Sequence, residues 1–228
     1  MTATLEQTVY KEGEFAGFMR NKDQFGAFSN MHANFPFYLG SILVSSNEAL
    51  YQALRFPAFP ERQEYVLSAG YAIGSKRRAY ESGVANFTAL DGEVSSATVP
   101  GWVSNGINVK AMRVCLWLKL CAYQDAIESL YALAGGKPIV EISFRDTFWG
   151  ATPQRDQVPA ITKGHNKLGK LWGEVMAESA LIPKSEWLNH VAKLSDGLYL
   201  YSDPLSKLIP LLSTENKENP EPGTLDLF

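Results

Sequence analysis

The sequence predicts a mainly α-helical α+β domain, compact and with a small β component. Apolar residues recur at helical spacing over several stretches, above all over 109–123, where they face nearly every direction. Two runs, 35–44 and 138–143, are short, apolar and rich in aromatic or β-branched residues, which is typical of strands. Hydrophobic residues make up 46% of the 228 residues, enough for one domain with a substantial core.

The first half of the chain is expected to hold a hairpin followed by two helices. The run FPFYLGSILV at 35–44 predicts a strand or hairpin. Ser45 and Glu48 have the spacing of a capping box, so a helix, EALYQALRF, is expected to begin here and to end before Pro57. A second helix is expected over about 60–69, with proline in its first turn.

The second half is expected to hold a loop insertion, four helices and one strand. Residues 82–106 are rich in Ser, Gly, Thr and Val and predict the insertion. The further elements are a buried helix over 109–123 capped by Asn108, a helix capped by Asp125 that ends at Gly135 and Gly136, a strand over 138–143, a loop over 151–163, a helix from Asn166 to about Met176, and a helix over 184–194.

Two regions are expected along the chain: a main domain, residues 1–195, and a C-terminal extension, residues 196–228. The last 13 residues, NKENPEPGTLDLF, have the composition of a disordered tail. Residues 224–228 are similar to the short peptide that docks in the bacterial sliding clamp. Leu225–Phe228 therefore make the clamp a candidate partner.

Charge, cysteine and histidine usage restrict the function classes. The net charge is −3 and the pI about 5.7, whereas a protein that holds duplex DNA by counterion release is usually basic, so any nucleic acid is expected to bind weakly and locally. Cys115 and Cys121 lie six residues apart on one expected helix, and His32, His165 and His190 have no metal-ligand spacing. We therefore expect no metal and no redox cofactor.

No targeting or membrane-spanning segment is expected. The stretch MTATLEQTVYKEGEF shows neither the basic nor the apolar region of a signal peptide. No stretch reaches the roughly 18 apolar residues that a membrane span needs. We expect a cytoplasmic protein without a membrane partner.

Five motifs, in this order, resemble those of the NADAR family of small N-glycosidases. They span residues 25 to about 176 and are FGAFSN at 25–30, SSNEALYQALRFP at 45–57, Met112 with Lys119, PIVEISFRDTFWGA at 138–151 and GHNKLGKL at 164–171. Where the family has a Ser-Pro-x-x-Ala-Lys element, this chain has SAGYAIGSK at 68–76. Lys76 is thus a shifted candidate for the basic residue of that element.

The resemblance implies a domain that hydrolyses N-glycosidic bonds to ribose-type sugars without a cofactor. The residues of these motifs are similar to those of one branch of the family, whose members are the antitoxin partners of DarT-type DNA ADP-ribosyltransferases. That branch removes ADP-ribose from guanine in DNA, so ADP-ribosylated DNA with a single-stranded or flipped guanine is the expected substrate, and an antitoxin or anti-defence factor the expected role. Two alternatives stay open: a metabolite-repair N-glycosidase acting on riboflavin-pathway intermediates, and a non-catalytic antitoxin that binds the toxin.

The resemblance assigns the chemistry to Glu48, Asp146 and Lys119. Glu48 either only closes a capping box or handles the proton of the leaving nitrogen or of the incoming water. Asp146 either bonds local amides or positions water and ribose hydroxyls. Lys119 either extends to the surface, or faces the cleft and meets a diphosphate or forms an imine with an opened ribose.

Substrate contacts are expected from Phe28, Ser29, Asn30, Gln52, Lys76, Trp102, Trp149, Gly150, Gly164 and Asn166. Trp149 and Trp102 are either core residues or plates on which a base stacks, and Gly150 would allow close approach. Asn166 either caps a helix or, with Gly164, opens a helix N-terminus that holds a diphosphate.

The remaining candidates also have two interpretations. Ser29 and Asn30 either form a turn or contact ribose hydroxyls. Lys76 belongs to the basic run 76–78, which is either a solvated charge run or a contact to a nucleic acid backbone.

Overall fold

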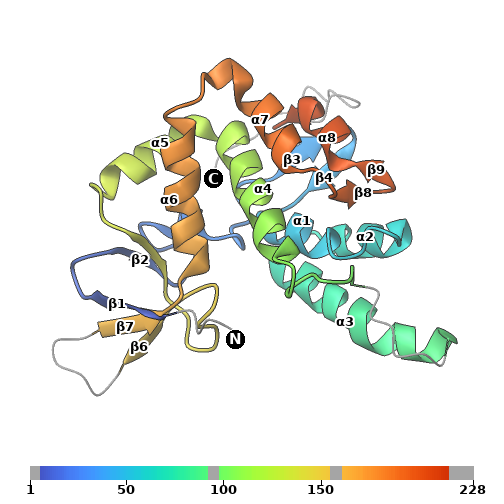
Figure 1. Cartoon of the computed structure of the whole chain (residues 1–228), viewed down its shortest axis with the longest axis horizontal. Coiled ribbons are helices and arrows are strands. Elements are labelled where there is room, and N and C mark those ends of the chain that lie inside the picture. Colours follow the sequence, from blue (N-terminus) through green and yellow to red (C-terminus); the bar gives the residue numbers. More distant parts are fainter. Residues whose placement is uncertain (1–5, 92–97, 155–160, 216–228) are drawn as a thin grey trace, which may run out of the picture.

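The computed structural model describes residues 6–91, 98–154 and 161–215, with only the backbone described for 82–91. The expected α+β class is confirmed, and helices hold many more residues than strands do (Figure 1). The helices are α1 (Asn47–Ala53), α2 (Pro60–Leu67), α3 (Ala72–Asp91), α4 (Ile107–Ala122), α5 (Gln124–Leu133), α6 (Lys167–Ser179), α7 (Trp187–Leu194) and α8 (Leu205–Leu208), with 3-10 turns η1 (Gly26–Phe28), η2 (Lys184–Glu186) and η3 (Ile209–Leu211).

The strands are short and form four small sheets among the described residues. They are β1 (Thr8–Lys11), β2 (Ala16–Phe18), β3 (Phe37–Leu39), β4 (Ile42–Val44), β5 (Ile139–Glu141), β6 (Thr152–Gln154), β7 (Ile161–Gly164), β8 (Tyr199–Leu200), β9 (Asp203–Pro204) and β10 (Leu212–Ser213). The sheet orders are β1-β7-β6, β10-β3-β4, β2-β5 and β8-β9. Strands β2 and β5 are parallel, and the other pairs are antiparallel.

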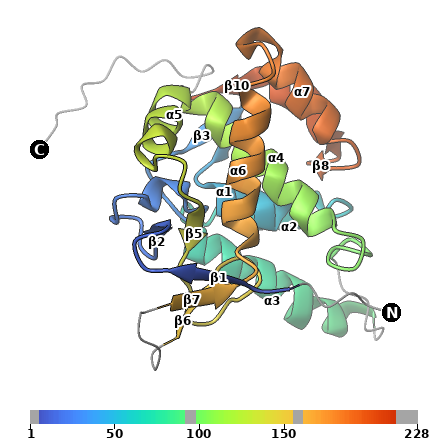
Figure 2. The same ribbon diagram turned by 60° about the vertical axis from the view of Figure 1, so that its left-hand side comes forward.

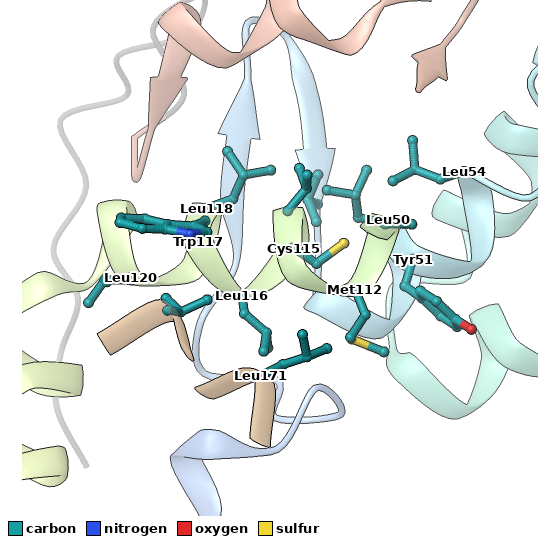
Figure 3. Packing of buried hydrophobic residues seen from close by; sticks show 14 of the residues in the cluster. Leu50, Tyr51, Leu54, Met112, Cys115, Leu116, Trp117, Leu118, Leu120 and Leu171 are labelled. Carbon is teal, nitrogen blue, oxygen red and sulfur yellow. The ribbon is translucent and has the colours of Figure 1, made fainter. Parts of the chain in front are cut away.

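Helix α4 is the centre of the core. Figure 1 shows it between α6 on one side and α1, α2 and α3 on the other, and Figure 2 shows α6 in front of it. Its side chains point in nearly every direction and are buried, as the sequence predicts, and Figure 3 shows them packed against Leu50, Leu54 and Leu171. The predicted cap is wrong: Gly106, with a left-handed φ of 70°, precedes the helix, and Asn108 lies inside it.

Helix α1 is tied to α4 by a buried polar contact. Asn47 Nδ2 donates to the carbonyl oxygen of Cys115 at 3.0 Å. A hydrogen bond that is shielded from water restricts the angle between two helices more than apolar contacts alone do. The face of α1 that carries Glu48 is thereby held in place.

Three sequence predictions about loops and boundaries need correction. Residues 82–91 continue helix α3, so the expected insertion 82–106 is not a loop throughout; 92–97 lie outside the described residues. The expected loop 151–163 contains β6 and β7, which pair as a hairpin. Asp125 lies in the first turn of α5, and Tyr123 is the residue that precedes the helix.

Residues after 195 pack into the same hydrophobic core as the rest of the domain. Leu198, Leu200, Leu205 and Ile209 are each at most 3% exposed. Strand β10 pairs with β3 of the predicted hairpin 35–44, which is confirmed. The described part of the C-terminal extension therefore does not form a separate packing unit, and Leu225–Phe228 lie outside the described residues.

No described helix is both long enough and apolar enough to cross a bilayer.

Helix α6 lies directly against the backbone of β5 at a glycine. A Cβ atom at Gly169 would sit 1.9 Å from the carbonyl oxygen of Ile139, whereas one at Gly173 would meet nothing within 4 Å. We predict that Gly169→Ala lowers the free energy of unfolding by about 2 kcal/mol or more, because helix and strand must move apart.

Gly173→Ala is the matched control on the same helix. It is expected to raise stability by roughly 0.5–1 kcal/mol through the better helix propensity of alanine. Urea denaturation followed by circular dichroism measures both variants, and a Gly169→Ala protein as stable as Gly173→Ala would contradict the close packing of α6 on β5.

Candidate active site

A pocket of about 300 Å³ lies between α1, α3, α4 and the segment that joins β5 to α6. It is lined by Asn30, Met31, Glu48, Tyr51, Gln52, Arg55, Lys76, Met112, Glu141, Ser143, Asp146, Trp149 and Leu168. Three of these residues carry carboxyl groups. Larger hollows beside α7 and β10 and between α4 and α6 are lined by only one or two acidic residues each.

Helix α1 begins one residue later than the capping box predicts, and this changes the role of Glu48. Ser46, not Ser45, is the N-cap, and its Oγ accepts from the Ala49 amide at 3.2 Å. The Glu48 side chain therefore takes no part in capping. Its carboxylate turns into the pocket, although Glu48 is only 6% exposed.

Glu48 and Gln52 lie on one face of α1, and Arg55 continues their row from the turn just after the helix. Gln52 Nε2 donates to Glu48 Oε1 at 2.8 Å, and Arg55 Nη1 donates to Gln52 Oε1 at 2.9 Å. Residues at i and i+4 share a helix face, which brings Gln52 to Glu48, and the turn at residues 54–55 brings Arg55 to Gln52. The amide of Gln52 bridges the two charged groups, which do not form an ion pair with each other.

Burial raises the pKa of the Glu48 carboxyl above its ordinary value. The hydrogen bond from Gln52 and the positive charges of Lys76 and Arg55 oppose this rise, and the charge of Asp146 adds to it. A carboxyl in this setting can hold a proton at a higher pH than an exposed glutamate.

Glu141, which the sequence analysis missed, supplies a second perturbed carboxyl at the end of β5. Burial, followed by the negative charges of Asp146 and Glu48, raises its pKa to about 7. Its signal in the sequence was an acidic residue directly after the apolar pair Ile139 and Val140, on a strand expected to be buried.

Asp146 bonds to local amides and also lines the pocket. Its Oδ1 accepts from the amides of Phe148 and Trp149, both at 2.9 Å, so it organises its own loop. Its amide in turn donates to Ser143 Oγ at 3.0 Å. The same residue lines the pocket beside Glu48 and Glu141.

The start of helix α6 holds this loop through backbone hydrogen bonds. The carbonyl oxygens of Thr147, Phe148, Trp149 and Gly150 accept from the amides of His165, Lys167, Leu168 and Asn166 at 2.7–3.1 Å. The first amides of a helix are the ones that would otherwise bind an anion. The diphosphate expected at this helix start is therefore misplaced, because these amides already have partners.

Asn166 does not cap the helix with its side chain. Its backbone is left-handed, with a φ of 47°, and its side chain points back to β5. Nδ2 donates to the Ile139 carbonyl at 2.7 Å, and Oδ1 accepts from the Glu141 amide at 3.2 Å. At 1% exposure Asn166 does not reach the pocket; it extends the pairing of β5 and fixes the strand end that carries Glu141.

Gly150 and Gly164 are required by packing and do not line the pocket. A Cβ atom at Gly150 would lie 2.6 Å from the carbonyl oxygen of Glu141. One at Gly164 would lie 2.5 Å from the carbonyl oxygen of Gly150. The sequence analysis expected Gly150 to let a substrate approach closely. In the structure, both glycines instead let two backbone segments approach each other.

Aromatic rings form one wall of the pocket. Trp149 lines it and meets Tyr51 edge-on, with ring centroids 5.7 Å apart. Trp102 packs behind Tyr51 at 5.3 Å and is only 6% exposed, so it supports the wall and does not line the pocket. Tyr51 was missed although it lies three residues after Glu48 on the same helix face.

Lys119, Phe28 and Ser29 lie behind the pocket and shape the turn that leads to Asn30. Lys119 is 1% exposed; its Nζ donates to the carbonyls of Ala27 and Ser29, the latter at 3.0 Å. Burial lowers the pKa of this lysine to about 7. Its amine is thus engaged in holding the turn, outside the pocket where an imine would form.

Phe28 and Ser29 make structural contacts in the same turn. The Phe28 carbonyl accepts from Trp172 Nε1 at 2.8 Å, and Ser29 Oγ accepts from the Met31 amide at 3.1 Å. Asn30 itself lines the pocket, where its Oδ1 is buried without a hydrogen-bond partner.

The structure thus brings together six of the residues expected from the sequence: Asn30, Glu48, Gln52, Lys76, Asp146 and Trp149. Phe28, Ser29, Trp102, Lys119, Gly150, Gly164 and Asn166 surround these without lining the pocket. Within the described ranges, no three His, Cys, Asp or Glu side chains are grouped so as to hold a metal ion.

The raised pKa of Glu141 predicts a stability that depends on pH. The folded protein keeps this proton up to pH about 7, whereas an unfolded chain releases it near the ordinary glutamate value, so stability falls between these two values as pH rises. We predict that Glu141→Gln, which cannot ionise, is more stable than the unmodified protein at pH 8 by about 2 kcal/mol, with little difference at pH 4.

Urea denaturation at the two pH values measures this difference. Glu174→Gln, which removes a partly exposed carboxylate on α6, is the control and should show no such pH-dependent gain. A Glu141→Gln gain that is the same at both pH values would contradict a buried, protonated Glu141.

No family model matches the chain, and no curated protein sequence matches it. Among solved structures, the NMR structure of the E. coli protein YbiA is similar to it, with a TM-score of 0.53 and 23% sequence identity. The similarity covers 73% of this chain and 85% of that chain. The chain therefore shares the YbiA fold.

Proposed function

We propose that the pocket is the active site of a NADAR-type N-glycosidase that hydrolyses the bond between ADP-ribose and a nucleobase, guanine in DNA. The observation that carries this proposal is the meeting of Glu48, Glu141 and Asp146 in one pocket beside Trp149. Glu48 and Trp149 lie about a hundred residues apart in the chain, yet the acidic and aromatic members of the motifs that resemble the NADAR family converge there.

Cleavage of an N-glycosidic bond develops positive charge on the ribose ring. Carboxylates placed around that ring stabilise the charge, and in a pocket with little water they do so more strongly than in solution. The same groups must also move protons: one to the leaving nitrogen and one from the attacking water. A cluster of carboxyl groups meets both requirements.

The perturbed pKa values suggest how the work is divided. Glu141, whose pKa is raised to about 7, can carry a proton near neutral pH and donate it to the departing nitrogen. Glu48 lies deeper and can take the proton of the attacking water, with Asp146 as a further acceptor for water or ribose hydroxyls. The arrangement is analogous to that of two-carboxylate glycosidases.

An imine between a lysine and an opened ribose is the rival route. Lys119 is a poor candidate because its amine bonds to backbone carbonyls behind the pocket. Lys76, on α3, lines the pocket and would take that role.

The modest size of the pocket favours a second candidate substrate. About 300 Å³ is at the small end of ligand pockets, so a free metabolite such as a riboflavin-pathway intermediate would be largely enclosed. With ADP-ribosylated guanine, only the reacting ribose would be enclosed, and base and adenosine would lie outside. A non-catalytic antitoxin that binds a DarT-type toxin has no specific support from this pocket.

We predict that Glu48→Gln lowers turnover by about a hundredfold or more while the fold persists, because the amide can still accept from Gln52 but cannot move a proton. Turnover is measured by chromatography with two substrates in parallel: an oligonucleotide carrying ADP-ribosylated guanine and a riboflavin-pathway intermediate.

Glu174→Gln on α6 serves as control and should keep full activity. Activity on the oligonucleotide alone supports the DNA reaction, and activity on the metabolite alone supports the repair reaction. Near-normal turnover by Glu48→Gln would remove the assignment of this residue, and an unmodified protein inert on both substrates would overturn the proposed function.

A further inference from the structure

Arg55 is a cation in the pocket that forms no ion pair with the acidic residues that the structure describes. Its guanidinium bonds to the neutral amide of Gln52 at 2.9 Å and to Thr98 Oγ1 at 3.4 Å. None of the ion pairs among the described residues includes it. Its Nε is buried without a hydrogen-bond partner.

Such an arrangement is costly in the empty protein. A partly buried charge loses hydration, and a neutral amide restores only part of that loss. Glu48 lies close enough to supply the missing charge, but Gln52 bridges the two and keeps them from pairing directly. The N–H donors that Gln52 and Thr98 do not use are therefore available for an anion that enters the pocket.

Lys76 reaches the same pocket from α3. It is exposed at its outer side, and no ion pair among the described residues includes it. One cation from the turn after α1 and one from α3 thus line the same cavity. A guanidinium with a nearby ammonium is the arrangement that suits a phosphate group, whose oxygens accept several charge-assisted hydrogen bonds.

We propose that Arg55, assisted by Lys76, binds a phosphate group on C5 of the ribose whose C1 bond is cleaved. The inference rests on the proposed glycosidase function, because it places C1 at the carboxyl cluster. C1 and C5 lie on opposite sides of the ribose ring oxygen, and Glu48 and Arg55 lie at opposite ends of the row bridged by Gln52. A phosphate held at Arg55 would thus direct C1 toward Glu48.

This assignment replaces the helix start at Gly164 and Asn166 as the phosphate site. The amides at that helix start are bonded to the carbonyls of the loop 147–150. Arg55 and Lys76, in contrast, have donors that face the pocket. The phosphate can be the first of a diphosphate, as in ADP-ribose, or a phosphate monoester on a smaller metabolite, and both present the same chemistry to Arg55.

Calorimetric titration of the unmodified protein with ribose, ribose 5-phosphate and ADP-ribose tests the inference without any turnover. Ribose 5-phosphate is expected to bind about tenfold or more tightly than ribose, in line with a charge-assisted hydrogen bond. ADP-ribose that binds more tightly still indicates a diphosphate, and equal affinity indicates a monoester. Equal affinity for ribose and ribose 5-phosphate would overturn the inference.

Variants then assign the effect to Arg55. Arg55→Gln should abolish the preference for ribose 5-phosphate, and Arg55→Lys should keep part of it. Arg77→Gln is the matched control, since Arg77 is an exposed cation paired with Glu81 at 2.8 Å and lies outside the pocket lining. Thermal unfolding checks that each variant is folded, and a folded Arg55→Gln protein with an unchanged preference would contradict the assignment.

Kinetics separate a failure of this inference from a failure of the proposed function. Arg55→Gln should raise KM for a phosphorylated substrate about tenfold with little change in kcat. Glu48→Gln should lose kcat but keep its affinity for ribose 5-phosphate. If the protein shows no glycosidase activity at all, the preference for ribose 5-phosphate over ribose still decides whether Arg55 binds phosphate.

Discussion

The attachment of helix α6 to strand β5 is the constraint on which the pocket depends. Asn166 continues the hydrogen bonding of β5 with its side-chain amide, and the following amides of α6 bind the carbonyls of the loop 147–150. Gly169 allows the helix to lie directly against the strand. Glu141 ends that strand, and Asp146 and Trp149 lie on or beside that loop. One junction therefore positions two acidic residues and the aromatic wall of the pocket.

The opposite wall is built from helix α1 by a different principle. Ser46 caps the helix and leaves the Glu48 carboxylate free, while Asn47 fixes the helix to α4. The row Glu48–Gln52–Arg55 then keeps opposite charges close without pairing them. Burying carboxyl groups together raises their pKa values and lowers stability, as is typical of sites selected for chemistry over folding. The rest of the core, centred on α4, has to offset that cost.

The sequence predicted the role of a residue where that role depends on its own helix, strand or motif. It did not predict the role where it depends on a contact between two elements. The buried helix α4 and the hairpin 35–44 follow from periodicity alone, and Glu48, Gln52, Asp146 and Trp149 follow from motif resemblance. An asparagine at the start of a helix is usually an N-cap, so the sequence predicts this role for Asn166. The side chain points toward β5 instead because the backbone of Asn166 is left-handed, which no local sequence pattern indicates. The motif residues 28, 29, 119, 150 and 164 proved to support the pocket from behind. Arg55 was overlooked because it lies in the turn after α1, where helical spacing does not show that it bonds to Gln52.

The dimensions of the pocket determine where substrate choice can reside. A cavity of about 300 Å³ can enclose a ribose ring and its C1 bond, and these parts are common to an ADP-ribosylated base and to a ribosylated metabolite. Carboxyl groups and Trp149 can therefore favour the reaction without distinguishing the two. For ADP-ribosylated guanine in DNA, discrimination would have to come from surfaces outside the cavity, which would contact the parts of the substrate beyond the reacting ribose. On helix α3, Lys76 lines the pocket and the neighbouring Arg77 is exposed, so this helix carries positive charge at the pocket and beside it. With a net charge of −3, the chain does not attract nucleic acid over its whole surface, so a DNA substrate would have to be recognised through local contacts of this kind.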